Sequence, residues 1–236
     1  MKKLLTALLF APAIALASGA ALHLDKAPDV QGDKAALQSG ARTFVNYCLN
    51  CHGASFVRYN RLTELGLTEQ QVKDNLMFTA EKIGEPMRVA ARPAEQKVWF
   101  GAAPPDLTLV ARARASADGS GADWLYTYLR SFYVDEKRPT GWNNTVFENV
   151  GMPNVLWQLQ GLQIAHKDHK LELAVPGSLS PAEYDKLVAD LVGFMVWMAE
   201  PDAGLRKHLG MGVLAFLVVL FGVAYALKKA YWKDVK

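Results

Sequence analysis

The sequence Cys48-Leu49-Asn50-Cys51-His52 carries most of the information in this chain. Two thiols separated by two residues, with a histidine directly after the second, form the pattern of covalent haem c attachment. Each thiol can add across one vinyl group of the porphyrin, and the next residue then lies beneath the ring, where its imidazole can bind the iron. We therefore predict one covalently bound haem c, attached through Cys48 and Cys51 and ligated by His52.

Two other interpretations of this motif are half of a zinc site and a redox-active dithiol. A zinc site requires further Cys or His ligands at short spacing, but none follow, and the chain contains only these two cysteines. A thioredoxin-like dithiol is expected between a strand and a helix, and the flanking segments do not have that pattern. A non-haem protein that maintains thiols in the periplasm is the alternative from a different class, and it predicts no visible absorption.

Apolar segments lie near both ends of the chain. Lys2 and Lys3, an apolar run over residues 4–16 and small residues around position 18 predict a signal peptide over residues 1–20. A retained N-terminal anchor is the alternative. Residues 209–227 contain no charged side chain, and these 19 residues would form a helix about 28 Å long, which matches the hydrocarbon core of a bilayer.

These segments predict the organisation of the whole chain. A signal peptide over 1–20 precedes a haem domain over 21–205, a transmembrane anchor over 206–228 and a cytoplasmic tail over 229–236. Basic residues flank the anchor on both sides, so the orientation rests on the export signal. We predict a single-pass protein of the bacterial inner membrane with its haem domain on the periplasmic side, where covalent haem attachment takes place in bacteria.

The net charge of the chain differs from that of the predicted haem domain. The chain has 26 basic and 23 acidic residues, a net charge of +3. Residues 18–205 alone contain 18 basic and 22 acidic residues, a net charge of −4. A mildly acidic domain argues against a surface that binds nucleic acid. It is compatible with a basic protein partner that is attracted by long-range electrostatic forces.

Helical patterns account for much of the predicted haem domain. Apolar residues at helical spacing indicate a helix over residues 33–47 that ends at the haem motif. A capping box at Thr68 starts a short helix toward Phe78. Large apolar residues predict a helix over 123–132, and the Ser-Pro-Ala-Glu sequence at 180–183 predicts a helix that ends before Pro201.

The segments between these helices are expected to be mostly irregular. Residues 83–105 are rich in Pro, Gly and Ala, residues 134–153 contain several turn formers, and residues 156–176 alternate weakly, which suggests a short hairpin. Long loops would count against a compact domain, but irregular chain can pack on a large rigid haem. Gly40 is either a point of close contact with another helix or a permissive glycine.

A second axial ligand is expected, because an electron carrier usually fills both sides of the iron. Methionine there raises the reduction potential relative to a second histidine. We favour Met152, since the Gly-Met-Pro sequence around it is a stiff loop that can aim a side chain at a metal. Met87 also follows a proline and remains a candidate, whereas His166 and His169 lie in a charged, solvated stretch. The other methionines are assigned to the core or the membrane: Met77, Met195, Met198 and Met211.

The two haem propionates require donors or water. The stiff turn Pro104-Pro105-Asp106-Leu107 leads to Arg112 and Arg114. Arginine pairs well with carboxylates because its guanidinium donates two parallel hydrogen bonds. The spacing does not distinguish the two arginines, and ordinary surface charge is the alternative for both.

Taken together, these features resemble the cytochrome c1 family, the haem-bearing subunits of the cytochrome bc1 complex. The resemblance covers nearly all of the mature chain. Its markers beyond the haem motif are the turn 104–107, Arg112-Ala113-Arg114, the Gly-Met-Pro sequence at 151–153 and the Ala-Glu-Pro sequence at 199–201, followed by one anchor. The implied fold is mainly α: a class I cytochrome c-like haem domain with long loop insertions, in which helices 33–47 and 180–199 cross.

The resemblance also implies roles for individual residues. It implies axial ligation by His52 and Met152, and it favours Arg114 over Arg112 as the propionate partner. Trp124 falls where the family places an aromatic side chain near the haem edge, and Pro105 is counted among the cofactor-binding residues.

The function implied by the resemblance is electron transfer with no bond-making chemistry of its own. Family members take one electron from the Rieske iron–sulfur protein and pass it to a soluble or membrane-bound cytochrome c, in a dimeric complex that includes cytochrome b. The alternative is a membrane-anchored c-type cytochrome that donates electrons to a terminal oxidase or a denitrifying reductase. Acidic residues are scattered here, whereas some relatives have an acidic tract for docking cytochrome c.

Overall fold

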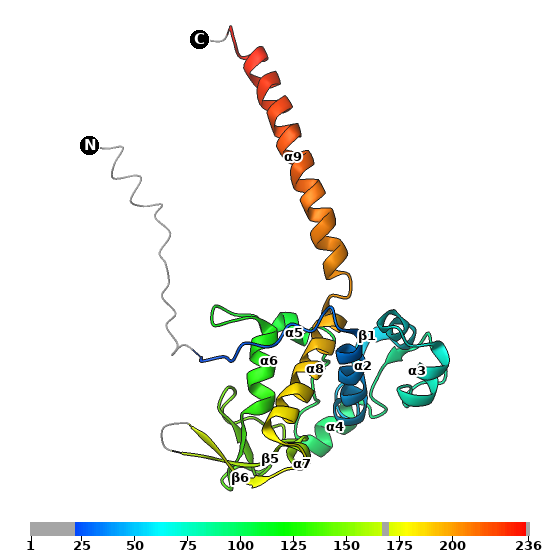
Figure 1. The fold of residues 1–236 in the computed structure, drawn as a ribbon, viewed down its shortest axis with the longest axis vertical. Coiled ribbons are helices and arrows are strands. Elements are labelled where there is room, and N and C mark those ends of the chain that lie inside the picture. Colours follow the sequence, from blue (N-terminus) through cyan, green and yellow to red (C-terminus); the bar gives the residue numbers. More distant parts are fainter. Residues whose placement is uncertain (1–21, 167–169, 235–236) are drawn as a thin grey trace, which may run out of the picture.

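A bundle of three helices forms the centre of the computed structural model, which describes residues 22–166 and 170–234 (Figure 1). The helices are α2 (Lys34–Thr43), α6 (Gly121–Arg130) and α8 (Pro181–Ala199). Long connections and short two-stranded sheets surround them, so the prediction of a mainly α protein is confirmed. The predicted signal peptide and His169 lie outside the described residues.

Helix α2 leads directly into the haem motif, as the sequence predicts. The carboxylate of Asp33 accepts hydrogen bonds from the backbone N–H groups of Ala35 and Ala36 and so caps the helix. The last turn continues as a short π-helix, η1 (Phe44–Cys48), which reaches the first cysteine. Such π turns often mark functional positions in helices.

Helices α2 and α8 cross where Gly40 lies. A Cβ atom added at Gly40 would lie 2.1 Å from the backbone oxygen of Asp190 and 2.8 Å from Cβ of Phe194. Beyond this point the rings of Phe44 and Phe194 pack with centroids 5.6 Å apart. Of the two interpretations of Gly40, close contact between helices is therefore the correct one.

The starts of the other main helices follow their capping residues. Ser180 and Glu183 form a capping box at α8, and Thr68 and Gln71 form one at α3 (Glu69–Asn75), as predicted. Helix α6 begins at Gly121, two residues earlier than predicted, because Ser120 caps it.

Part of the chain that was expected to be irregular is regular. Within residues 83–105, the strand β2 (Pro86–Met87) pairs with β1 (Ala54–Arg58), and α4 (Pro93–Phe100) follows. Pro93 occupies the first turn of α4, where proline is tolerated, so it begins a helix rather than breaking one. The prediction of irregular chain was wrong here.

The remaining elements are short. Between residues 134 and 153, β4 (Trp142–Asn144) pairs with β3 (Phe132–Val134), where a loop was expected. The suggested hairpin is present as β5 (Gly161–Ala165) and β6 (Leu171–Pro176). The other short helices in the described part of the chain are the 3₁₀ helix η2 (Tyr59–Leu65), α5 (Val110–Ala113) and α7 (Trp157–Gln160).

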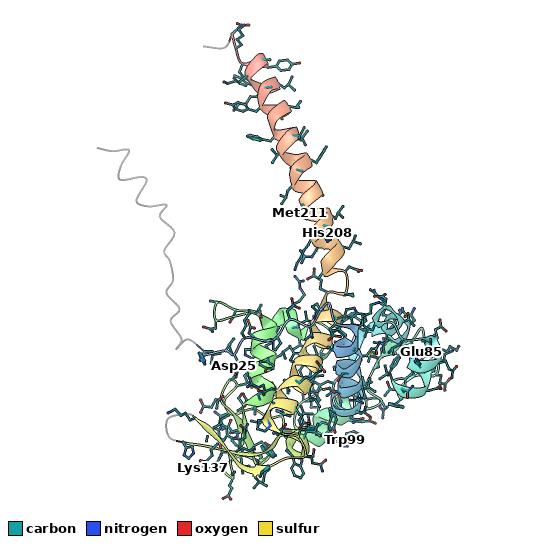
Figure 2. The ribbon with its side chains drawn as sticks, viewed as in Figure 1. Asp25, Glu85, Trp99, Lys137, His208 and Met211 are labelled. Atoms are coloured by element: carbon teal, nitrogen blue, oxygen red, sulfur yellow. The ribbon has the colours of Figure 1, made fainter. Side chains whose placement is uncertain are left out.

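One long apolar helix, α9 (Ala203–Tyr231), projects away from the helical body (Figure 1). None of its residues is buried, and by length and composition it could cross a membrane. Figure 2 places His208 and Met211 on its first turns, outside the body of the protein. The apolar run 209–227 therefore forms a single helix that begins three residues before the predicted anchor boundary at 206.

Asp123 holds the segment that precedes α2, which includes Lys26 and Ala27, against α6. The Asp123 carboxylate accepts hydrogen bonds from the backbone N–H of Ala27 at 2.8 Å, from Lys26 Nζ at 3.1 Å and from the backbone N–H of Ser120 at 3.2 Å. Burial alone would raise the pKa of Asp123, but these hydrogen bonds outweigh it and lower the pKa to about 2.

Replacing Asp123 by asparagine should lower the free energy of unfolding by about 2 kcal/mol at pH 7. A carboxyl group with a lowered pKa in the folded state stabilises that state above its unfolded pKa, near 4, and this stabilisation is lost as the pH falls toward 2. Denaturant unfolding of the two proteins, followed by circular dichroism, should therefore give curves that differ at pH 7 and converge near pH 2. A constant difference across this range would contradict the assignment.

Candidate functional site

Two backbone hydrogen bonds fix the turn of the haem motif. The backbone N–H groups of Cys51 and His52 both donate to the carbonyl oxygen of Cys48, at 3.1 Å and 2.8 Å. Cys48 is buried and Cys51 is partly exposed. Burial and the neighbouring thiol of Cys51 raise the pKa of Cys48 to about 12. A redox-active dithiol needs the opposite shift, because the thiolate is the reactive form.

His52 is held as a neutral imidazole in one orientation. Its Nδ1 lies 2.7 Å from the carbonyl oxygen of Pro105, which can only accept, so Nδ1–H donates. Burial lowers the pKa of His52 despite the opposing effects of Pro105 and Asp106. With the proton on Nδ1, Nε2 keeps its lone pair, and this is the tautomer that a metal ligand requires.

Several hydrogen bonds fasten the 104–107 turn to the chain that follows the motif. The backbone N–H of Leu107 donates to the carbonyl oxygen of Gly53 at 2.8 Å. The Asp106 carboxylate accepts from the backbone N–H of Ser55 at 2.7 Å and from Thr108 Oγ1 at 2.6 Å. These bonds fix the carbonyl group of Pro105 against His52, so Asp106 supports the site without contacting the imidazole by a hydrogen bond.

Helix α4 supplies a residue that the sequence analysis missed. The side chain of Gln96 is buried, and its Nε2 donates to the carbonyl oxygen of Cys51 at 2.9 Å. An amide buried at this position fixes the backbone between the second thiol and the histidine. The available sequence signal was the helix start at Pro93, which would have placed Gln96 on a helix.

A second group of side chains forms a continuous stack. The Arg114 guanidinium lies 4.4 Å from the centre of the Trp124 ring, and Trp124 stacks on Tyr128 with centroids 4.8 Å apart. The Tyr128 hydroxyl lies 3.4 Å from the sulfur of Met152. We call these four residues the Arg114–Met152 stack. It brings together three predicted site residues and adds Tyr128, which lies on the helix predicted over residues 123–132 but was not a predicted site residue.

The other candidates lie elsewhere. Arg112 forms an ion pair with Glu200, with Nη1 and Oε2 2.6 Å apart, so it does not join the stack. Met87 is fully buried, opposite Ala54 in the β1–β2 pair. His166 pairs with Glu172 at 2.7 Å on the surface. The methionines that were assigned to the core lie there: Met195 and Met198 are buried, and Met77 packs against the core. Met211 is exposed on α9, the helix that could cross a membrane.

The predicted site residues thus form two groups: His52 with Pro105, and Arg114 with Trp124 and Met152. No hydrogen bond, ion pair or ring contact joins the two groups among the described residues. The donor set fits a haem c, because two thiols in the attachment motif, an imidazole with a free Nε2 and a thioether are the groups that hold this cofactor. Within residues 22–166 and 170–234, no three His, Cys, Asp or Glu side chains gather at a metal-binding distance, so a zinc site finds no further ligands there.

The haem motif, the His52–Pro105 pair and the exposed apolar helix α9 are features that a membrane-anchored c-type cytochrome requires. The model of the "Cytochrome C1 family" matches residues 26–235. The chain is 45% identical to cytochrome c1 of Allochromatium vinosum, with all of both chains covered. It is 31% identical to cytochrome c1 of Rhodospirillum rubrum, over 86% of this chain and 83% of that one. It is also 48% identical to a Nitrosomonas europaea protein named ammonia monooxygenase gamma subunit, over 100% of this chain and 98% of that protein.

The chain belongs to the cytochrome c1 family. This membership implies a haem c cofactor and a membrane-anchored electron-transfer subunit of the respiratory bc1 complex, which also contains cytochrome b and a Rieske protein.

Proposed function

We propose that this chain accepts one electron from the Rieske iron–sulfur protein and passes it to a soluble or membrane-bound cytochrome c. Cys48 and Cys51 would hold one haem c covalently, and His52 and Met152 would bind its iron. The observation that carries this proposal is the hydrogen bond from His52 Nδ1 to the carbonyl oxygen of Pro105. Because Nδ1 makes this bond, the opposite ring nitrogen, Nε2, is free to bind iron.

The role of the protein residues is to hold the redox centre in one arrangement. When bound, the haem supplies one-electron oxidation and reduction of iron. His52 is fixed by Pro105, and the motif backbone is fixed by Gln96, so the imidazole keeps its position in both oxidation states. Arg114 is the proposed propionate donor, since it lies on Trp124 while Arg112 is bound to Glu200. No residue is required to make or break a substrate bond.

The proposed location is the bacterial inner membrane, with the haem domain on the periplasmic side. The support is the export pattern at residues 1–20 and the requirement that haem is attached outside the cytoplasm. Helix α9 would cross the membrane once and leave residues 229–236 in the cytoplasm. The complex is also proposed to be a dimer, because the resemblance to the cytochrome c1 family implies a dimeric complex.

A second candidate function follows from the similarity to the Nitrosomonas europaea protein. That protein is named as a subunit of an ammonia monooxygenase. The corresponding proposal for this chain is electron transfer within a monooxygenase complex instead of a bc1 complex. Both candidates use the same haem, so only the partner proteins distinguish them.

Copurification from the native membrane separates the candidates. A tagged full-length chain, extracted in mild detergent, should give a haem c band in a reduced-minus-oxidised spectrum and a peroxidase-positive band after denaturing electrophoresis. Cytochrome b and a Rieske protein should copurify. A double Cys48→Ala/Cys51→Ala variant serves as the control and should lose the covalent band.

Three other outcomes would change the conclusion. Monooxygenase subunits in place of cytochrome b would support the second candidate. A terminal oxidase or a denitrifying reductase as the copurifying partner would support the alternative drawn from the sequence. A wild-type chain without covalent haem, produced in a host that can mature c-type cytochromes, would contradict every candidate that uses haem and would support a dithiol protein.

A further inference from the structure

We propose that Tyr128 is a positioning residue that raises the reduction potential of the haem by donating a hydrogen bond to the sulfur of Met152. The inference rests on the proposed function, in which Met152 is an axial ligand. It assigns a specific task to a residue that carries no recognisable motif.

The direction of the Tyr128–Met152 hydrogen bond is fixed by chemistry. Tyr128 Oη lies 3.4 Å from Met152 Sδ. A thioether sulfur has no proton and accepts only weakly, so the phenol must be the donor. The Tyr128 side chain is buried, and in the described part of the chain the sulfur is the one hydrogen-bond partner of its hydroxyl group.

The surrounding residues leave Tyr128 little freedom. Its ring is stacked on Trp124 with 13° between the ring planes, and Phe132 contacts it edge-on with centroids 5.0 Å apart. Its backbone carbonyl group accepts a 2.8 Å hydrogen bond from Asn144 Nδ2, at the end of α6. The hydroxyl is therefore held toward the sulfur by the ring packing and the backbone, and a buried phenol with no other partner would gain nothing by turning away.

The effect on the redox couple follows from electron donation. A proton shared with the sulfur withdraws electron density from it, so the sulfur becomes a weaker donor to iron. Ferric iron loses more from a weaker donor than ferrous iron does, and the reduced form is favoured. The hydroxyl occupies one lone pair of the Met152 sulfur and so fixes the direction of the other lone pair, which would bind iron. Removing it should shift the reduction equilibrium toward the oxidised form by about three- to tenfold, and a tenfold shift corresponds to about 59 mV in a one-electron couple.

The test compares Tyr128→Phe with Tyr126→Phe in the full-length, haem-loaded protein in detergent. Both variants keep an aromatic ring on α6 and lose one hydroxyl group. The Tyr126 ring packs beneath Arg130, with Arg130 Cζ 4.4 Å from its centroid, and among the described residues the hydrogen bond to Met152 comes from Tyr128 instead. We expect Tyr128→Phe to lower the midpoint potential and to alter the far-red charge-transfer band of methionine-ligated ferric haem. Tyr126→Phe should change neither.

Two results would overturn the inference. The first is an unchanged potential and band in Tyr128→Phe, and the second is an equal shift in Tyr126→Phe. Met152→Leu is measured alongside, because it shows whether a negative result concerns the role of Tyr128 or the ligation of iron by Met152. If Met152→Leu lowers the potential while Tyr128→Phe does not, ligation stands and only the role of Tyr128 is wrong. If neither variant changes the potential, Met152 is not the ligand.

Discussion

Replacing Met152 by leucine should leave the haem attached and lower its reduction potential by on the order of 0.1 V or more. Attachment depends on Cys48 and Cys51, which the substitution does not touch. Leucine has nearly the same volume as methionine, so packing beside Tyr128 changes little. What is lost is a thioether that stabilises ferrous iron relative to ferric iron. Redox titration followed by absorption spectroscopy measures the change.

A matched control for Met152→Leu is available within the core. Met195 is buried on α8 and is proposed to have no contact with iron, so Met195→Leu should keep the potential of the unmodified protein. A peroxidase-positive band after denaturing electrophoresis would show that both variants retain covalent haem. An unchanged potential in Met152→Leu would remove this residue from the iron. Met87, the other candidate for the iron ligand, is less suitable because it is fully buried in the β1–β2 pair.

The long helices were predictable because their signals are local. Ser180 and Thr68 cap α8 and α3 through residues three positions ahead, and these contacts need no tertiary structure. Strand β2 was not predicted because a distant contact stabilises it, and α4 was missed although Pro93 offered a local helix start. Strand β2 has two residues and exists through its pairing with β1, and α4 is attached to the haem motif through Gln96.

The candidate site also combines features set by local sequence with features set by distant contacts. The haem motif is readable from sequence because the chemistry of attachment fixes its spacing. Tyr128 and Met152 are 24 residues apart, and Gln96 and Cys51 are 45 residues apart, so only the fold brings these pairs together. Spacing also could not separate Arg112 from Arg114. In the folded chain, Glu200 at the end of α8 binds Arg112, whereas Arg114 turns toward Trp124.

Replacing Gly40 by alanine should lower the free energy of unfolding by about 3 kcal/mol and reduce the fraction of chains that carry haem. In an exposed helix this substitution would stabilise by about 1 kcal/mol. Here the new Cβ would lie 2.1 Å from the backbone oxygen of Asp190, and a backbone atom cannot move aside as a flexible side chain can. The steric cost therefore exceeds the gain in helix propensity.

The loss of haem follows from where α2 leads. Helix α2 must move away from α8 to admit the methyl group, and its last turn continues through η1 into Cys48. A displacement of the helix thus moves the first thiol and weakens the packing of Phe44 on Phe194. Gly84→Ala is the control, because a Cβ there meets no atom within 4 Å. Thermal unfolding and the ratio of haem to protein absorbance should fall for Gly40→Ala alone, and equal values for both variants would contradict the close crossing of α2 and α8.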